Sequence, residues 1–426
     1  MFEYLVAGLL TFTTPPSSPT VPTVSPARQQ PAQSEIDELR RRLDVLAQEL
    51  ERLRSGEPEE ELTEAQRRSL GVAPSAAAIY RKKQGVSFAG YGEIVYQKLD
   101  DTLENGAASP ASSRFDFLRA VLYAGYRFND RFLFNSEIEF EHGGEEVGVE
   151  FAYVDYRVRN DLTLRGGLLL LPMGLINEFH EPTVYFGTGR PETERRIVPS
   201  TWRENGAGVL GSRGPVSYRA YVVTGLNARG FSANGIRGGR QSGKEAIAEN
   251  FAFVGRADLA PLDGVLVGGS LYAGASGQNQ VGEVDAGTTI GEVHGQAQMR
   301  GLDVRALYAR ASIDDAAALN GALKLTGAAG IGSVMEGGYA QAGYNVLNRR
   351  STTIALTPYY RFERVNTHAE VPAGFTADPA KRITWQTLGL ELRPVTGVVV
   401  KTDYQWVTNG ARTGRNQFNI ALGYAF

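Results

Sequence analysis

GRNQFNIALGYAF, residues 414–426, is the stretch that decides the fold predicted for this chain. Its aromatic and aliphatic side chains alternate with small or polar ones, which is the period of two residues that a β-strand shows. A barrel in lipid needs such a strand, because its outer face meets hydrocarbon and its inner face meets water. The alternative is the edge strand of a soluble sandwich. The apolar positions are Phe418, Ile420, Leu422, Tyr424 and Phe426.

The composition argues against a helical membrane protein and against a nucleic-acid partner. The chain has 426 residues, 50 Gly and a net charge of −3, and its mean hydropathy is −0.23. Beyond the amino terminus the longest apolar run lies near 166–171, which is far short of the ~20 residues that a spanning helix needs. The near-neutral net charge does not favour nucleic acid. Barrel strands remain compatible with these values, since half of each strand is polar.

Residues 1–33 are predicted to be a signal-like segment followed by a disordered spacer. The run LVAGLLTF at 5–12 resembles the apolar core of a secretory signal, although Glu3 is the only charged residue before it. Residues 14–33 are rich in Pro, Ser and Thr, a composition typical of disorder. We therefore expect the chain to be exported.

Residues 34–56 are predicted to form a coiled-coil helix in the periplasm. Apolar residues recur there with strict 3-4 spacing over three heptads. Three heptads are marginal alone, so the partner helices would need to be held together by a trimeric barrel. A single helix packed on the rim of its own barrel is the alternative, and a dimer would show similar spacing. Residues 57–84 are interpreted as a connector. The heptad residues are Ile36, Leu39, Leu43, Leu46, Leu50 and Leu53.

From residue 85 onward the period becomes two, and sixteen strand-like segments can be placed. Short turns such as Asn129-Asp130 alternate with longer polar loops such as 225–248, which is the pattern of outer-membrane barrels. The predicted fold class is all-β, a 16-stranded antiparallel transmembrane β-barrel over 85–426. The segments are 86–98, 114–128, 131–141, 147–159, 161–171, 205–213, 215–224, 249–259, 264–274, 289–299, 301–312, 334–346, 350–364, 381–393, 396–408 and 414–426.

The third exterior connection, 172–204, is the longest and mixes aromatic residues with charges of both signs. A loop packed inside a barrel needs such apolar anchors, whereas a free exterior loop does not. Opposed charges at a constriction would orient polar solutes and set ion preference. The alternative is that these charges pair with each other and with the wall, and only hold the loop in place. The candidate constriction residues are Glu178, Glu181, Arg190, Arg195, Arg196 and Arg203.

The stretches LPMGLINEFHEP at 171–182 and RRIVPSTWRENGAGVLG at 195–211 resemble the phosphate-selective porin O and P family. They are similar also to DcaP-like trimeric porins, which carry a periplasmic coiled coil before the barrel. The resemblance covers 86–426 and the helix at 34–55. It implies a homotrimer of sixteen-stranded barrels in the bacterial outer membrane, with an inward third loop. Tyr424 and the final Phe426 are similar to the signal read by the barrel-assembly machinery, an expected partner together with outer-membrane lipid.

Phosphate-selective members line the pore with an arginine ladder and a lysine cluster. In this chain the inward positions combine arginines with carboxylates such as Asp155 and Asp258, and Lys is scarce. A lumen with charges of both signs fits the general passage of small solutes and ions, including anions, better than specificity for phosphate. Structural pairs between neighbouring strands are the alternative for each residue. The candidate wall residues are Arg119, Arg157, Arg165, Arg219, Arg256 and Arg305.

No motif for catalysis, a cofactor or a metal is found. The four His, at 142, 180, 294 and 368, lack ligand spacing, and neither GxSxG nor a P-loop occurs. Arg237 and Arg240 flank Gly238-Gly239 at what is interpreted as a loop tip. We therefore expect a porin for passive diffusion and no enzyme. The rivals are a channel specific for phosphate, polyphosphate or dicarboxylate, and an envelope tether that acts through the coiled coil.

Overall fold

The structure is a computed structural model that describes residues 36–45, 47–48 and 61–426. The chain divides into two compact units, 1–60 and 61–426. Among the described residues, no helix is both long and apolar enough to cross a membrane.

In the first unit the described residues are helical, and Ile36, Leu39 and Leu43 are exposed. Their side chains form an apolar stripe along this helix. The other three predicted heptad residues, Leu46, Leu50 and Leu53, lie outside the described residues. The coiled coil therefore stays a prediction.

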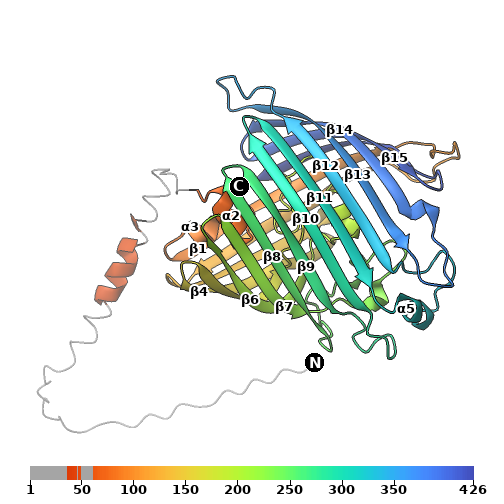
Figure 1. Cartoon of the computed structure of the whole chain (residues 1–426). Helices are drawn as coiled ribbons and strands as arrows, with labels where there is room; N and C mark the ends of the chain where they lie inside the picture. Colours follow the sequence, from red (N-terminus) through yellow and green to blue (C-terminus); the bar gives the residue numbers. More distant parts are fainter. Residues whose placement is uncertain (1–35, 46, 49–60) are drawn as a thin grey trace, which may run out of the picture. The chain divides into compact units, whose positions relative to one another are not determined.

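The second unit is a closed barrel of sixteen antiparallel strands, each paired with its sequence neighbours (Figure 1). The first strand pairs with the last and closes the sheet, with Tyr91 opposite Ala425 and Lys98 opposite Phe418. The predicted fold class and strand number are confirmed. The strands are β1 (Gly85–Leu99), β2 (Arg114–Arg127), β3 (Phe132–Glu141), β4 (Glu146–Arg159), β5 (Leu162–Leu170), β6 (Arg203–Arg213), β7 (Val216–Thr224), β8 (Phe251–Leu262), β9 (Val265–Ala275), β10 (Gly287–Met299), β11 (Leu302–Ile313), β12 (Val334–Tyr344), β13 (Ala355–Glu370), β14 (Arg382–Val395), β15 (Val398–Asn409) and β16 (Gln417–Ala425).

Short helices occupy the segments outside the strands. Figure 1 shows α2 and α3 at the end of the barrel where the carboxy terminus lies, and α5 at the opposite end. The helices are α2 (Glu64–Leu70), α3 (Ala78–Arg81), α4 (Thr193–Arg196) and α5 (Ala316–Ala322), with 3-10 turns η2 (His142–Gly144), η3 (Ala228–Gly230), η4 (Arg237–Gly239) and η5 (Pro379–Lys381).

The predicted strand ends are close to the observed ones except at β13, which was expected at 350–364. The turn before β13 is longer than predicted, because the Asn345 side chain accepts hydrogen bonds from the backbone N–H of both Leu347 and Leu356. An Asn carbonyl that binds backbone in this way replaces ladder bonds with a turn. The strand therefore begins later and extends to Glu370.

The alternation of side chains gives the barrel two different faces. In β16 the side chains of Phe418, Ile420 and Leu422 are exposed on the outside, whereas Asn419 and Ala421 are buried inside. The outer face is apolar on the other strands as well, and many inward side chains are charged and buried. The inward side chains are buried because two segments of the chain pack against them.

One of these is the segment 61–84, called here the inner segment. Thr63 and Gln66 form a capping box at the start of α2, and the helix ends at Gly71 with φ +63°. The following residues pack against Tyr123, Phe151 and Leu169 of the wall in one apolar cluster. Sequence reasoning interpreted 57–84 as a connector and missed this packing. The capping box was available as a signal for helix α2, but it does not indicate where the helix packs.

The wall is shaped to receive the inner segment at Gly125 of β2. A Cβ added there would lie 2.8 Å from the side chain of Ile79. Real Cβ atoms do not approach other carbon atoms so closely, because dense interiors leave no such overlap. Glycine at this position therefore lets Ile79 lie directly on the backbone of β2.

Candidate functional site: the occupied lumen

The third loop, residues 171–202 between β5 and β6, is closed at its neck by Asn177. Its side-chain N–H groups donate to the carbonyls of Leu171 (2.8 Å) and Trp202 (2.9 Å), and its Oδ1 accepts from Trp202 N–H (2.7 Å). The backbone N–H of Leu171 also donates to Trp202 O at 2.9 Å. One buried amide thus fixes both ends of the loop. Sequence reasoning did not single out Asn177.

Beyond its neck the loop is bonded to the wall. Lys401 of β15 donates to the carbonyls of Tyr185 (2.6 Å) and Gly187 (3.1 Å). Thr188 donates to Asp403 of the same strand through its N–H and its hydroxyl. These inward charges are satisfied by the loop, so they contribute to its position.

Strands β12 and β13 hold the loop in the same way. Tyr339 of β12 donates to Glu194 at 2.6 Å, and the N–H of Thr193 donates to Glu363 of β13 at 2.6 Å. The loop therefore lies inside the barrel, bonded to inward side chains of β12, β13 and β15. The alternation along each strand could have shown that these wall residues point inward, but not that they bind the loop.

Five of the six residues predicted for the loop constriction are bound within the protein, and one of them, Arg203, is the first residue of β6 and not part of the loop. Glu178 pairs with Arg219 at 3.2 Å, and Arg203 forms an ion pair with Glu150. Glu181 accepts from the N–H (2.9 Å) and the hydroxyl (3.1 Å) of Ser75. The remaining pair, Arg195 and Arg196, binds Glu192.

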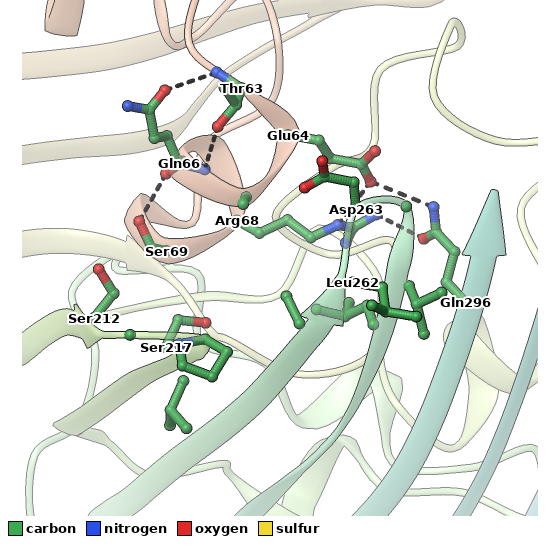
Figure 2. A pocket seen from close by; sticks show the side chains of 18 residues that line it. Thr63, Glu64, Gln66, Arg68, Ser69, Ser212, Ser217, Leu262, Asp263 and Gln296 are labelled. Carbon is green, nitrogen blue, oxygen red and sulfur yellow. Dashed lines mark hydrogen bonds and ion pairs between the residues drawn. The ribbon is translucent and has the colours of Figure 1, made fainter. Parts of the chain in front are cut away.

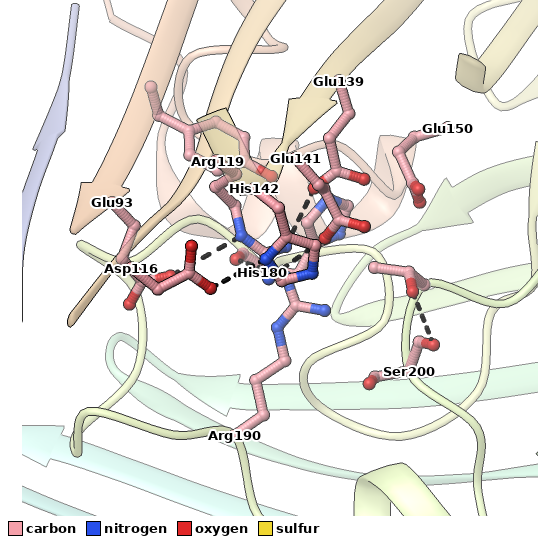
Figure 3. Close-up of polar contacts among 12 residues, drawn as sticks. Glu93, Asp116, Arg119, Glu139, Glu141, His142, Glu150, His180, Arg190 and Ser200 are labelled. Atoms are coloured by element: carbon pink, nitrogen blue, oxygen red, sulfur yellow. Dashed lines mark hydrogen bonds and ion pairs between the residues drawn. The ribbon is translucent and has the colours of Figure 1, made fainter. Parts of the chain in front are cut away.

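Arg190 is the sixth predicted loop residue and forms no ion pair within the described chain. Its guanidinium reaches toward the carbonyl of His180, at 3.4 Å. Figure 3 shows the side chain extending from the loop toward His180 and Arg119. His180 in turn lies 3.0 Å from Glu137, and Arg119 pairs with Glu139 at 3.0 Å. Arg190 therefore differs from the other three arginines of this set in having no carboxylate in direct contact within the described chain.

The predicted wall arginines are mostly paired with carboxylates. Arg165 donates twice to Asp155, at 2.7 and 2.9 Å, and Arg219 and Arg256 share Asp258. Such pairs neutralise charge, so these residues do not form a row of free cations. Arg305 pairs with Asp303, Arg119 pairs with Glu93, Glu139 and Glu141, and the exposed Arg157 donates to the carbonyl of Asp130.

The inner segment is anchored to inward side chains by polar contacts. Arg68 donates to Gln296 at 2.7 Å, and the carbonyl of Arg68 accepts from Arg219 at 2.5 Å. Further along, Tyr80 donates to Asp155 at 2.7 Å. Through Ser75 the segment also contacts the third loop, as described for Glu181. The inner segment and the third loop therefore form one connected body in the lumen.

Helix α2 lines two cavities. One, of about 540 Å³, lies between the helix and the β6–β7 and β8–β9 turns (Figure 2). The other, of about 330 Å³, is lined by α2, by the third loop and by strands β10, β11, β13 and β14. Glu64 and Arg68 line both. The helix is therefore not packed tightly on every side.

A third cavity, of about 550 Å³, is lined by the third loop and by residues 230–240. Arg195, Arg196, Arg237 and Arg240 line it with a single carboxylate, Glu192. Arg237 and Arg240 donate to carbonyls of the loop. Burial and the neighbouring arginines lower the pKa of Arg237. The loop tip predicted at Arg237 and Arg240 is thus part of a basic cavity.

The described residues contain no group of three or more His, Asp or Glu side chains that could hold a metal ion. His294 lies between Glu292 and Asp258, at 2.9 Å from each. This buried trio also contacts Arg256, which would repel a cation.

The barrel and its inward third loop define a class. A closed sixteen-stranded antiparallel barrel is the fold of outer-membrane porins, and solved structures match it. Pseudomonas putida OprB has a TM-score of 0.55 and 11% identity, over 80% of this chain and 94% of that chain. Salmonella typhi OmpF, solved with daunomycin, has a TM-score of 0.53 and 12% identity, over 81% and 98%. Vibrio cholerae OmpT has a TM-score of 0.51 and 14% identity, over 81% and 98%.

Sequence comparison places the chain in a family. An uncharacterised protein of Aquifex aeolicus strain VF5 is 37% identical over 360 residues, which is 80% of this chain and 80% of that protein. The chain belongs to the same family as this protein. No family model matches the chain. The likenesses give the porin fold, and the resemblance to the phosphate-selective porin O and P family stays a prediction.

Proposed function

We propose that the protein is an outer-membrane channel through which small solutes and ions diffuse passively. The observation that carries this proposal is the contrast between the two faces of the closed barrel. Its outer face carries exposed Phe, Leu, Val and Ile side chains, and its inner face carries buried charged ones. Closure leaves no unpaired strand edge, so the backbone can tolerate lipid. Because the number of strands is even, the chain enters and leaves the barrel on the same side of the membrane. We propose that this side is the periplasm.

The third loop and the inner segment would together restrict the pathway. Both are bonded to inward side chains, and cavities remain beside them. A solute would therefore pass between charged groups of both signs rather than through an open tube. Passive transport by this route requires no catalytic residue and no cofactor.

The solute preference follows from the charges that remain free. Most wall arginines are neutralised by carboxylates, which supports weak selectivity. The basic cavity at Arg195, Arg196, Arg237 and Arg240 would attract anions, and this supports the passage of anions among the solutes. A channel specific for one anion is the second candidate, and it rests on this cavity alone.

We also propose a homotrimer, assembled by the barrel-assembly machinery, with the helix at 34–56 as a periplasmic trimerisation element. The exposed Ile36, Leu39 and Leu43 support this part, because an apolar heptad stripe requires partner helices to cover it. The terminal Tyr424 and Phe426 are proposed as the assembly signal.

The test is the current through the purified protein in a planar lipid bilayer. We expect stable conductance in KCl that closes in three equal steps, and a reversal potential in a tenfold KCl gradient that reports the ion preference. The same preparation after heat denaturation is the control. Absence of conductance in the native sample would contradict the channel, and closure in single steps would contradict the trimer.

A further inference from the structure

The cavity of about 330 Å³ beside α2 has the size and lining of a small-molecule site. Ligand sites in proteins have volumes of roughly 300–1,000 Å³ and combine apolar walls with a few polar groups. Here Phe179 and Phe186 of the third loop supply two aromatic rings. The polar groups come from α2 and from strands β11 and β14.

The charges around this cavity have both signs. Arg305 is paired with Asp303 at 2.8 Å, and Arg393 is paired with Glu391 at 2.6 Å. Each of these two arginines also donates to a carbonyl of the third loop. Arg67 lines the same cavity and forms no ion pair within the described chain. The lining can therefore offer both an acceptor and a donor.

Two buried atoms of opposite character lack a hydrogen-bond partner, and the guanidinium that carries one of them lies 4.8 Å over the ring of Phe179. Oε2 of Glu391 and Nη1 of Arg68 make no hydrogen bond with the described residues. The two side chains are 2% and 5% exposed, and both line the cavity. An unsatisfied buried polar atom costs about 1–3 kcal/mol, and more when it is charged. A ligand that binds both atoms would remove this cost at two places.

We propose that this cavity is a binding site for small zwitterions of the α-amino acid class. The ammonium group would donate to Glu391, the carboxylate would accept from Arg68 and Arg67, and an apolar side chain would contact Phe179 and Phe186. An anion of the same shape provides no donor for Oε2 of Glu391, and a cation provides no acceptor for Nη1 of Arg68. The inference rests on the proposed channel and names a solute class for it.

The first experiment compares three solutes of one shape in the bilayer assay. L-leucine carries both charges, 4-methylpentanoate lacks the ammonium group, and 3-methylbutylamine lacks the carboxylate. We expect L-leucine to reduce the KCl current at a concentration about tenfold lower than either analogue, the effect of one charged hydrogen bond. Equal potency of the three solutes, or no block by L-leucine in a conducting channel, would overturn the site. Absence of any KCl current would instead overturn the channel itself.

The second experiment locates the site with matched variants. Glu391→Gln and Arg68→Gln each remove one charge from the cavity. Glu370→Gln and Arg310→Gln make the same changes in a half-exposed ion pair on the barrel's outer side. We expect the concentration of L-leucine for half block to rise about tenfold in the first two variants only. Equal shifts in cavity and control variants would overturn the assignment. If a cavity variant fails to fold, the comparison of the three solutes on the unmodified protein still decides.

Discussion

At the scale of single residues, the two segments inside the barrel are held in place by specific contacts of a few residues. Gly125 provides room for Ile79, and Asn177 joins the two ends of the third loop. Neither role could be predicted from the alternation of apolar and polar residues, because each depends on contacts between segments that are distant in sequence.

Gly125→Ala should destabilise the protein. The added methyl would overlap Ile79, and overpacking of this kind costs about 1–3 kcal/mol. We expect a lower midpoint of thermal unfolding. The unfolding is monitored by circular dichroism in detergent. Gly291→Ala in β10 is the matched control, because a Cβ there meets no atom within 4 Å. Equal midpoints for the two variants would mean that the inner segment is not packed on β2.

Asn177→Ala should loosen the third loop. The change leaves the buried Trp202 N–H without its partner, at a cost of about 1–3 kcal/mol, while the carbonyls of Leu171 and Trp202 keep their backbone N–H donors. We expect more frequent current fluctuations in single-channel recordings, with little change in the strand content. Asn279→Ala is the control, since Asn279 is exposed and lies in the loop 276–286. Identical noise in both variants would show that the neck does not limit loop motion.

At the scale of elements, the period of two predicted the strands, because lipid and lumen impose opposite polarity on successive side chains. The inward third loop could be expected from its aromatic residues, and Trp202 and Tyr185 are buried as that reasoning requires. The pairing partners could not be predicted. Glu181, for example, is bound by Ser75 of the inner segment, and a single sequence gives no register between an inserted segment and a wall.

The inner segment could not be placed from sequence, because its small apolar residues between 72 and 79 fit an exposed connector as well as a buried one. Deletion of 61–84 should widen the pathway. We expect a unit conductance about twofold higher, as a wider constriction passes more ions. Deletion of 1–60 is the control and should leave the conductance unchanged. Unchanged conductance after deletion of 61–84 would mean that ions already bypass this segment.

At the scale of the whole molecule, the proposed trimer would depend on the predicted helix at 34–56. Removal of 34–56 should weaken the trimer without closing the channel, because the pathway lies within 61–426. We expect a larger monomer fraction after chemical cross-linking and an unchanged unit conductance. Removal of 14–33 is the control. A fully retained trimer would assign the oligomer to barrel contacts alone.

The inner segment is covalently tethered to the barrel, and this affects how a free peptide could compete with it for the lumen. Only Lys82, Lys83 and Gln84 separate the end of α3 from the start of β1. If the segment left the lumen, it would stay near the barrel mouth at an effective concentration in the millimolar range, as short linkers impose. A free peptide with the sequence of 61–84 would therefore need a comparable concentration to replace it. Re-entry is an intramolecular event, so its rate should not depend on the amount of protein in the membrane.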